Sequence, residues 1–141
     1  KTSLALQESL ARIESLRKII RPCTFISPYS LQKKSGLELY IASESFQISG
    51  SFKFRAAYNL AANTSEELLI TASSGNFGQA LACACKMLGK KCIVVMPQNS
   101  AKLKIELTMS WGAQVDLVDT AKITRAERLR QIHLKHPQAY L

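Results

Sequence analysis

A lysine at position 53 is the side chain in this sequence with the best setting for covalent chemistry. It follows a turn of small residues, Ser49–Ser51, and Phe52 and Phe54 flank it. A helix from Phe52 to about Ala62 would place the lysine in the positive field of the helix N-terminus. That field and burial beside the two rings both favour the uncharged amine, which attacks carbonyl carbons. Taken alone, the lysine also fits an exposed helix position.

A second polar turn lies between an apolar run and a helical pattern. Leu68–Ala72 predicts a short buried strand, and Phe77–Leu88 predicts a helix. The residues between them, Ser73-Ser74-Gly75-Asn76, offer hydroxyls and backbone N–H groups at a helix N-terminus, an arrangement that binds anions. Ordinary capping is the alternative, but a cap needs one such residue and not four in succession.

The two turns together resemble a known family. The first motif reads Gly50-Ser51-Phe52-Lys53-Phe54-Arg55, and the second reads Ser73-Ser74-Gly75-Asn76-Phe77-Gly78-Gln79. In this order they resemble the fold-type-II pyridoxal-phosphate enzymes, in the branch of threonine/serine dehydratases and serine racemases. The resemblance runs from about Pro22 to Val118. It implies pyridoxal 5'-phosphate as cofactor and a lyase that removes ammonia from a β-hydroxy amino acid such as threonine or serine. Racemisation of serine or another amino acid is the alternative on the same fold.

The resemblance also implies which residues bind the cofactor. Lys53 would hold its aldehyde as a Schiff base and, once released, act as the general base. Phe52 would pack against one face of the pyridine ring. Asn76 would donate a hydrogen bond to the ring oxygen.

A substrate site follows from the same resemblance. The substrate carboxylate would be bound by the backbone and hydroxyls of five consecutive residues: Ser73, Ser74, Gly75, Asn76 and Phe77. Ser74 matches the hydroxyl that faces the α-carbon opposite the lysine in racemases. Three stretches depart from the family pattern: Phe77 replaces a common histidine, Cys23-Thr24-Phe25 replaces Thr-Pro-Leu, and Ile41-Ala42-Ser43-Glu44 replaces Leu-Lys-x-Glu.

The elements that must position these residues alternate regularly from Leu68 onward. Further strands are predicted at Lys91–Met96, Gln114–Val118 and, more weakly, Ala139–Leu141, and further helices at Ala101–Trp111 and Thr124–Lys135. Apolar strands joined by helices predict an α/β fold, an open twisted parallel sheet with helices on both faces. Ligands of such sheets bind at the carboxyl ends of the strands, where Ser73 falls.

The N-terminal part reads less regularly. A helix is expected to end near Ile20, residues 22 to 36 are expected to be irregular because Pro22, Pro28 and Gly36 break them, and Leu37–Ala42 is expected to be a strand. By the resemblance, residues 1–67 form the N-terminal portion of a large cofactor domain and residues 68–141 form a small α/β domain.

The family's remaining cofactor contacts come from a C-terminal half. These are a glycine-rich cup for the phosphate and a hydroxyl or thiol at the pyridine nitrogen, yet no glycine cluster follows Gly112. The chain is therefore predicted to be a fragment, a split subunit, or a truncated relative that has lost catalysis and only binds partners. The complete protein is expected to be a homo-oligomer, a dimer.

Composition bears on whether the protein could span a membrane, bind nucleic acid or hold a metal. The chain has 141 residues, 47% of them hydrophobic, and no apolar run approaches a membrane span. Its net charge of +9 raises the possibility of a nucleic-acid-binding domain, but the basic residues are scattered and no such module is present. The cysteines (Cys23, Cys83, Cys85 and Cys92) have no metal-site spacing, and we interpret them as reduced core or near-core thiols of a cytoplasmic protein.

Overall fold

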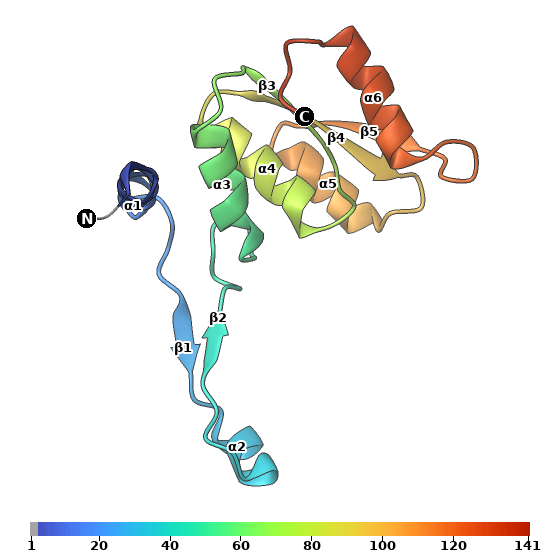
Figure 1. Cartoon of the computed structure of the whole chain (residues 1–141). Coiled ribbons are helices and arrows are strands. Elements are labelled where there is room, and N and C mark those ends of the chain that lie inside the picture. Colours follow the sequence, from blue (N-terminus) through green and yellow to red (C-terminus); the bar gives the residue numbers. More distant parts are fainter. Residues whose placement is uncertain (1–2) are drawn as a thin grey trace. The chain divides into compact units, whose positions relative to one another are not determined.

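The computed structural model describes residues 3–141 and shows two compact units with a boundary between Phe52 and Lys53 (Figure 1). The first unit contains α1 (Leu4–Leu16), β1 (Thr24–Ile26), α2 (Tyr29–Ser35) and β2 (Ile41–Ser43). The second contains α3 (Lys53–Ala62), β3 (Leu68–Ala72), α4 (Asn76–Met87), β4 (Lys91–Pro97), α5 (Lys102–Ser110), β5 (Gln114–Val118) and α6 (Arg125–Lys135). The boundary expected after residue 67 refers to the domains of a complete protein and stays a prediction.

The first unit corrects three expectations. Helix α1 ends at Leu16, and short-range hydrogen bonds such as Ile19 N–H to Leu16 O (3.0 Å) continue the chain as turns up to Ile20. The segment 22–36, expected to be irregular, contains β1 and α2, because Pro28 precedes a helix as its N-cap and does not break one. Gly36, with a φ of +68°, then ends α2 in the left-handed conformation.

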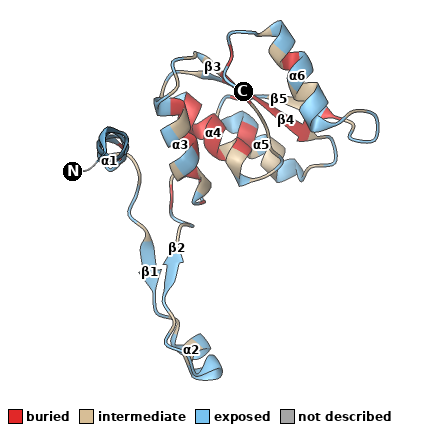
Figure 2. Ribbon diagram, viewed as in Figure 1, coloured by how far each residue is buried: buried red, intermediate tan, exposed pale blue. Residues whose placement is uncertain are grey.

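The strand expected at Leu37–Ala42 is shorter and later than predicted. Strand β2 begins at Ile41 and pairs antiparallel with β1, with Ile26 opposite Ile41 and Thr24 opposite Ser43. Most side chains of this two-stranded ribbon are exposed, whereas buried residues are concentrated in the second unit (Figure 2). The apolar residues between positions 37 and 42, which suggested a strand, are therefore mostly exposed and not packed in a core.

A parallel sheet in the order β3-β4-β5 forms the centre of the second unit. Strands β3 and β5 have their predicted bounds, and β4 extends one residue further, to Pro97. The strand expected at Ala139–Leu141 is reduced to a single parallel bridge, in which Tyr140 N–H donates to Leu68 O (2.9 Å) and Ile70 N–H donates to Tyr140 O (2.8 Å). This bridge places the C-terminal residues beside β3.

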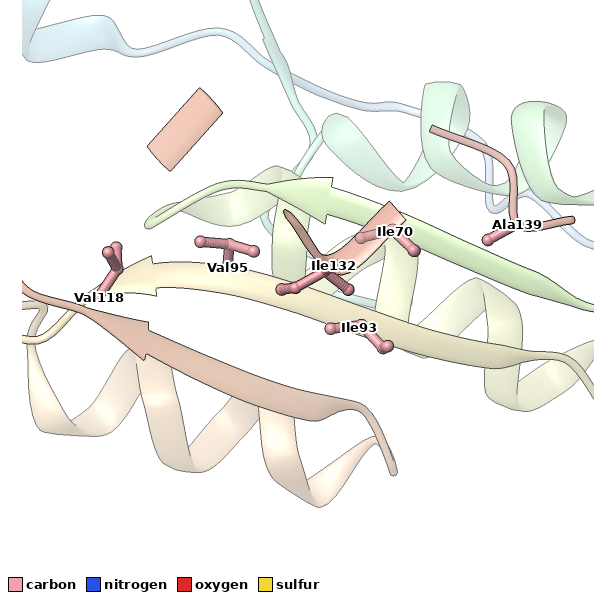
Figure 3. Close-up of a cluster of buried hydrophobic side chains, with 6 residues drawn as sticks. All are labelled: Ile70, Ile93, Val95, Val118, Ile132 and Ala139. Carbon is pink, nitrogen blue, oxygen red and sulfur yellow. The ribbon is translucent and has the colours of Figure 1, made fainter. Parts of the chain in front are cut away.

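Helices cover both faces of the sheet, as the sequence predicts. On one face, Ile132 of α6 joins a buried cluster with Ile70, Ile93, Val95, Val118 and Ala139 (Figure 3). Helices α4 and α5 pack against the strands on the other face, and α3 packs against α4 (Figure 1). Successive side chains of a strand point to opposite faces of the sheet. Five consecutive residues of β4, 92 to 96, are buried, so both faces of this strand are covered. No helix within residues 3–141 combines the length and apolar character needed to cross a membrane.

Candidate active site

Lys53 is the first residue of α3 and is half-buried. The buried stripe of α3 is Phe54, Ala57, Tyr58 and Ala61, which follow helical spacing, and the rings of Phe54 and Tyr58 lie 5.5 Å apart. Phe52 falls outside this stripe and is 57% exposed, so its own ring is not part of the buried core. Phe54 alone of the two aromatic neighbours anchors the start of the helix.

The second predicted turn is shaped by Ser73. Its Oγ atom accepts hydrogen bonds from the backbone N–H of Gly78 (3.0 Å) and, at a longer distance, of Gly75 (3.4 Å). Gly75 is the N-cap of α4 and has no side chain to cap the helix. The serine therefore supplies the capping oxygen from two positions upstream, and its side chain is used to shape the turn.

Two N–H groups at the start of α4 keep their capacity to bind a ligand. The first N–H groups of a helix have no intrahelical acceptor, and Ser73 satisfies only those of Gly75 and Gly78. The backbone N–H groups of Asn76 and Phe77 lie in this position, beside the exposed Ser74. Donors of this kind at a helix N-terminus favour an anion, which is the chemistry predicted for this turn.

Phe77, which stands where the resembled family commonly has histidine, is half-buried. It lines a cavity of about 270 Å³ together with Leu60, Leu69, Ile70, Thr71, Leu81, Tyr140 and Leu141. Its backbone N–H lies at the turn while the residue also lines this cavity. The position can therefore contribute a donor without a polar side chain.

Helices α3 and α4 begin on the same side of the second unit (Figure 1). The two helices pack against each other and both begin at the lower end of the group in Figure 1. Lys53 is the first residue of one, and the Ser73–Phe77 turn leads into the other. Both lie within the second unit, so the amine and the turn predicted to bind an anion stand at the same end of two packed helices.

Sequence reasoning missed one residue at the turn. The Nζ atom of Lys104, on α5, donates a hydrogen bond to Oδ1 of Asn76 at 2.6 Å, across 28 positions of the chain. The only sequence signal was a lysine in the first turn of a predicted helix, which is indistinguishable from a solvent-exposed lysine before packing is known.

Three cysteines are buried in the second unit, as predicted for core thiols. Burial raises the pKa of the Cys83 thiol to about 11, and the nearby Lys86 opposes this only partly. The Cys92 thiol donates to the Cys85 sulfur, which lowers the pKa of Cys85 and raises that of Cys92. No group of three metal-binding side chains is found among residues 3–141. These thiols pack the core and are not part of the site.

Comparison with known proteins decides the family. The family described as "Pyridoxal-phosphate dependent enzyme" matches residues 16–141. The chain belongs to this family. Its resemblance to the fold-type-II dehydratase and racemase branch is confirmed.

Three relatives of this pyridoxal-phosphate-dependent family illustrate the match. The chain is 33% identical to a serine racemase of Dictyostelium discoideum over 93% of this chain and 41% of the relative. It is 33% identical to an L-threonine ammonia-lyase of Thermotoga maritima over 81% of this chain and 29% of the relative. The solved structure of a threonine deaminase from T.th. is similar with a TM-score of 0.83 and 31% identity, over 96% of this chain and 44% of that one. The chain thus spans less than half the length of the relatives it matches.

The residues present fit the family's cofactor as far as this chain extends. A half-buried lysine at a helix start can reach a carbonyl group, and the Asn76 amide can donate to an anionic oxygen. The Ser73–Phe77 turn offers donors for one anionic group. The family's remaining cofactor contacts, expected from a C-terminal half, stay a prediction.

Proposed function

We propose that the complete protein carrying this chain is a pyridoxal-phosphate-dependent ammonia-lyase that acts on a β-hydroxy amino acid such as threonine or serine. The observation that carries the proposal is that Lys53 begins α3, that the Ser73–Phe77 turn leads into α4, and that these two helices pack against each other. Membership of the family supports it, as do relatives named as ammonia-lyases.

Three residues would serve the cofactor. Lys53 would bond to its aldehyde, Asn76 would donate to its ring oxygen, and Phe52, whose side chain is 57% exposed, would pack its apolar surface against the ring. When bound, pyridoxal phosphate would act as an electron sink for bonds at the substrate α-carbon. Lys53, once released, would remove the α-proton as general base.

The turn would orient the substrate. A carboxylate held by the N–H groups of Asn76 and Phe77 gains the positive field of the α4 N-terminus. Ser73 would preserve the shape of this site through its bonds to Gly75 and Gly78. Ser74 is exposed, so its hydroxyl can meet the substrate directly. Fixing the carboxylate at one end of the substrate leaves the α-carbon to be placed against Lys53.

Reduction with borohydride in the presence of pyridoxal phosphate tests the assignment. The reduced cofactor should be recovered by peptide mapping on the peptide that contains Lys53, and label on any other lysine would overturn the assignment. In parallel, threonine and serine should each be tested for release of ammonia and a 2-oxo acid. A protein labelled at Lys53 that releases neither product would keep the cofactor site and exclude the lyase.

Racemisation is the second candidate, and Ser74 is the observation that favours it. An exposed hydroxyl at the turn can supply a proton to the face of the α-carbon opposite Lys53. A serine racemase is among the relatives that match most of this chain. Elimination needs only Lys53 and a leaving group, whereas racemisation needs a second group correctly placed, and we therefore favour the lyase.

The location and the partners of the protein are also part of the proposal. Reduced thiols at Cys83, Cys85 and Cys92 suit the cytoplasm, where disulfides are rare. A homodimer is proposed on the family resemblance alone, and we propose that neither a nucleic acid nor a membrane is a partner. Light scattering of the complete protein would test the dimer.

A further inference from the structure

The contact between Lys104 and Asn76 has a chemical consequence for the turn. Lys104 lies in the first turn of α5, and its Nζ atom approaches Oδ1 of Asn76 to 2.6 Å. An ammonium group has three donors and no acceptor, whereas an asparagine amide has a donating and an accepting end. The partner therefore fixes the orientation of the amide: the oxygen faces Lys104, and the NH₂ group is directed elsewhere.

Lys104 is placed for this contact by its own helix. Its backbone N–H donates to Ala101 O (2.8 Å), and its backbone oxygen accepts from the hydroxyl of Thr108 (2.8 Å). Thr108 is buried, with an exposed fraction of 1%. Helices α4 and α5 pack against each other. The lysine is half-buried on this helix, so that its ammonium reaches the first residue of α4.

A second lysine on the same helix, Lys102, has a different kind of partner. The side chain of Lys102 is 90% exposed and lies 3.7 Å from Glu106 in an ion pair along the helix surface. Among residues 3–141, no carboxylate forms an ion pair with Lys104. The charge of Lys104 is thus directed to the Asn76 amide, and the two lysines form a matched pair for comparison.

We propose that Lys104 is a positioning residue that holds the Asn76 amide with its NH₂ group available to an anionic ligand at the turn. This inference rests on the proposed function, in which that ligand is the ionised ring oxygen of pyridoxal phosphate. A hydrogen bond from a charged donor is stronger than one between neutral groups, and it polarises the amide, so the N–H groups of Asn76 become better donors. Without Lys104, the amide can rotate and present its oxygen to the anion, which would repel it.

The first test examines the contact itself in the cofactor-free protein of native length. Lys104→Met should shift the side-chain amide resonances of Asn76 in a ¹⁵N–¹H correlation spectrum, and Lys102→Met should leave them in place. Asn76→Ala assigns the resonances by their loss. Unchanged Asn76 resonances in Lys104→Met would overturn the inference, even in an enzyme that is active.

The second test measures the affinity for pyridoxal phosphate by absorbance titration. Lys104→Met should weaken binding about tenfold, as expected for the loss of a hydrogen bond that involves a charged group. Lys104→Arg, which also has donors only, should restore most of the affinity, whereas Lys104→Gln, which can donate or accept, should not. Thermal melting of each variant separates these effects from a loss of folding.

A double variant decides whether Lys104 acts through Asn76. If it does, Lys104→Met combined with Asn76→Ala should bind no more weakly than Asn76→Ala alone. Losses that multiply would overturn the inference, and so would a loss in Lys102→Met as large as that in Lys104→Met. If the wild-type protein binds no pyridoxal phosphate, the proposed function fails and with it the role toward the cofactor, while the resonances still decide the contact.

Discussion

The Oγ atom of Ser73 accepts a hydrogen bond from the N–H of Gly78 at 3.0 Å, and the same glycine has no room for a side chain. A Cβ atom at position 78 would lie 2.9 Å from the carbonyl oxygen of Ser73 and 2.9 Å from Cγ1 of Val94. The third residue of α4 is thus pressed against the end of β3 and against β4. This close approach fixes where the helix begins relative to the sheet, and so where its free N–H groups point.

Replacement of Gly78 by alanine should therefore destabilise the protein. In most helices the change from glycine to alanine is favourable by about 1 kcal/mol. Here we expect a loss of about 1–3 kcal/mol in the free energy of unfolding, because the Ser73 carbonyl cannot move aside without distorting the turn. Urea unfolding measures it. Gly75→Ala is the control, since nothing lies within 4 Å of its Cβ position and φ is −127°. Equal stability of the two variants would show that the contact is readily relieved.

Ser74→Ala should separate the two candidate reactions. If Ser74 supplies the second proton-transfer group, its loss should remove racemisation and leave partial release of ammonia. Ser73→Ala should instead lower stability by about 1 kcal/mol and reduce both reactions, because its oxygen holds two N–H groups of the turn. Activity assays on both substrates' enantiomers, with melting curves, check this. Equal loss of both reactions in Ser74→Ala would instead assign Ser74 to substrate binding.

Lys53→Ala should abolish turnover in the complete protein. Without the amine there is no bond to the cofactor aldehyde and no general base for the α-proton. The exposed Lys33 on α2 is the control: Lys33→Ala should keep activity and change stability by no more than about 0.5 kcal/mol. Steady-state kinetics and urea unfolding provide both numbers. Residual turnover in Lys53→Ala that approaches that of the wild type would place the chemistry elsewhere.

Cys83 should make stability depend on pH in the alkaline range. Burial raises its pKa from the ordinary value of 9.0 to about 11, so the folded state holds the proton more tightly than the unfolded state. The sign follows: the contribution is complete below pH 9 and is lost as the pH rises toward 11. Unfolding free energies of wild type and Cys83→Ala should converge by roughly 2 kcal/mol between pH 8 and pH 11. Parallel curves would contradict the effect of burial.

The second unit was predictable because its signals are local. The bounds of β3 and β5 were predicted correctly, since apolar runs are flanked by polar turns and Gly89 ends α4 with a φ of +70°. The first unit was not, because Pro28 and Gly36 bound a short helix that reads from sequence as a loop. Lys104 could not have been found, since its partner Asn76 is 28 positions away and only the packing of α5 on α4 joins them.

The last prediction concerns these 141 residues expressed alone. In the first unit many large apolar side chains are exposed, among them Phe25 (74%), Tyr29 (75%), Leu37 (66%), Tyr40 (64%) and Phe46 (66%). Exposed apolar surface of this kind favours association. The chain spans 41% of the serine racemase it matches, and the Ser73–Phe77 turn is proposed to bind the substrate carboxylate and not the cofactor phosphate.

We therefore expect the 141-residue chain to self-associate, to bind pyridoxal phosphate weakly and to release no ammonia. Light scattering over a range of concentrations should show the mass rising, and replacing Phe25 and Tyr40 with serine should reduce that rise. Replacing the exposed Lys33 and Lys34 of α2 with serine, as a control, should not reduce it. The phosphate of the cofactor needs several convergent N–H donors, and we expect the missing ones from the family's C-terminal half. Stoichiometric cofactor binding with measurable ammonia release would show instead that this chain holds a complete site.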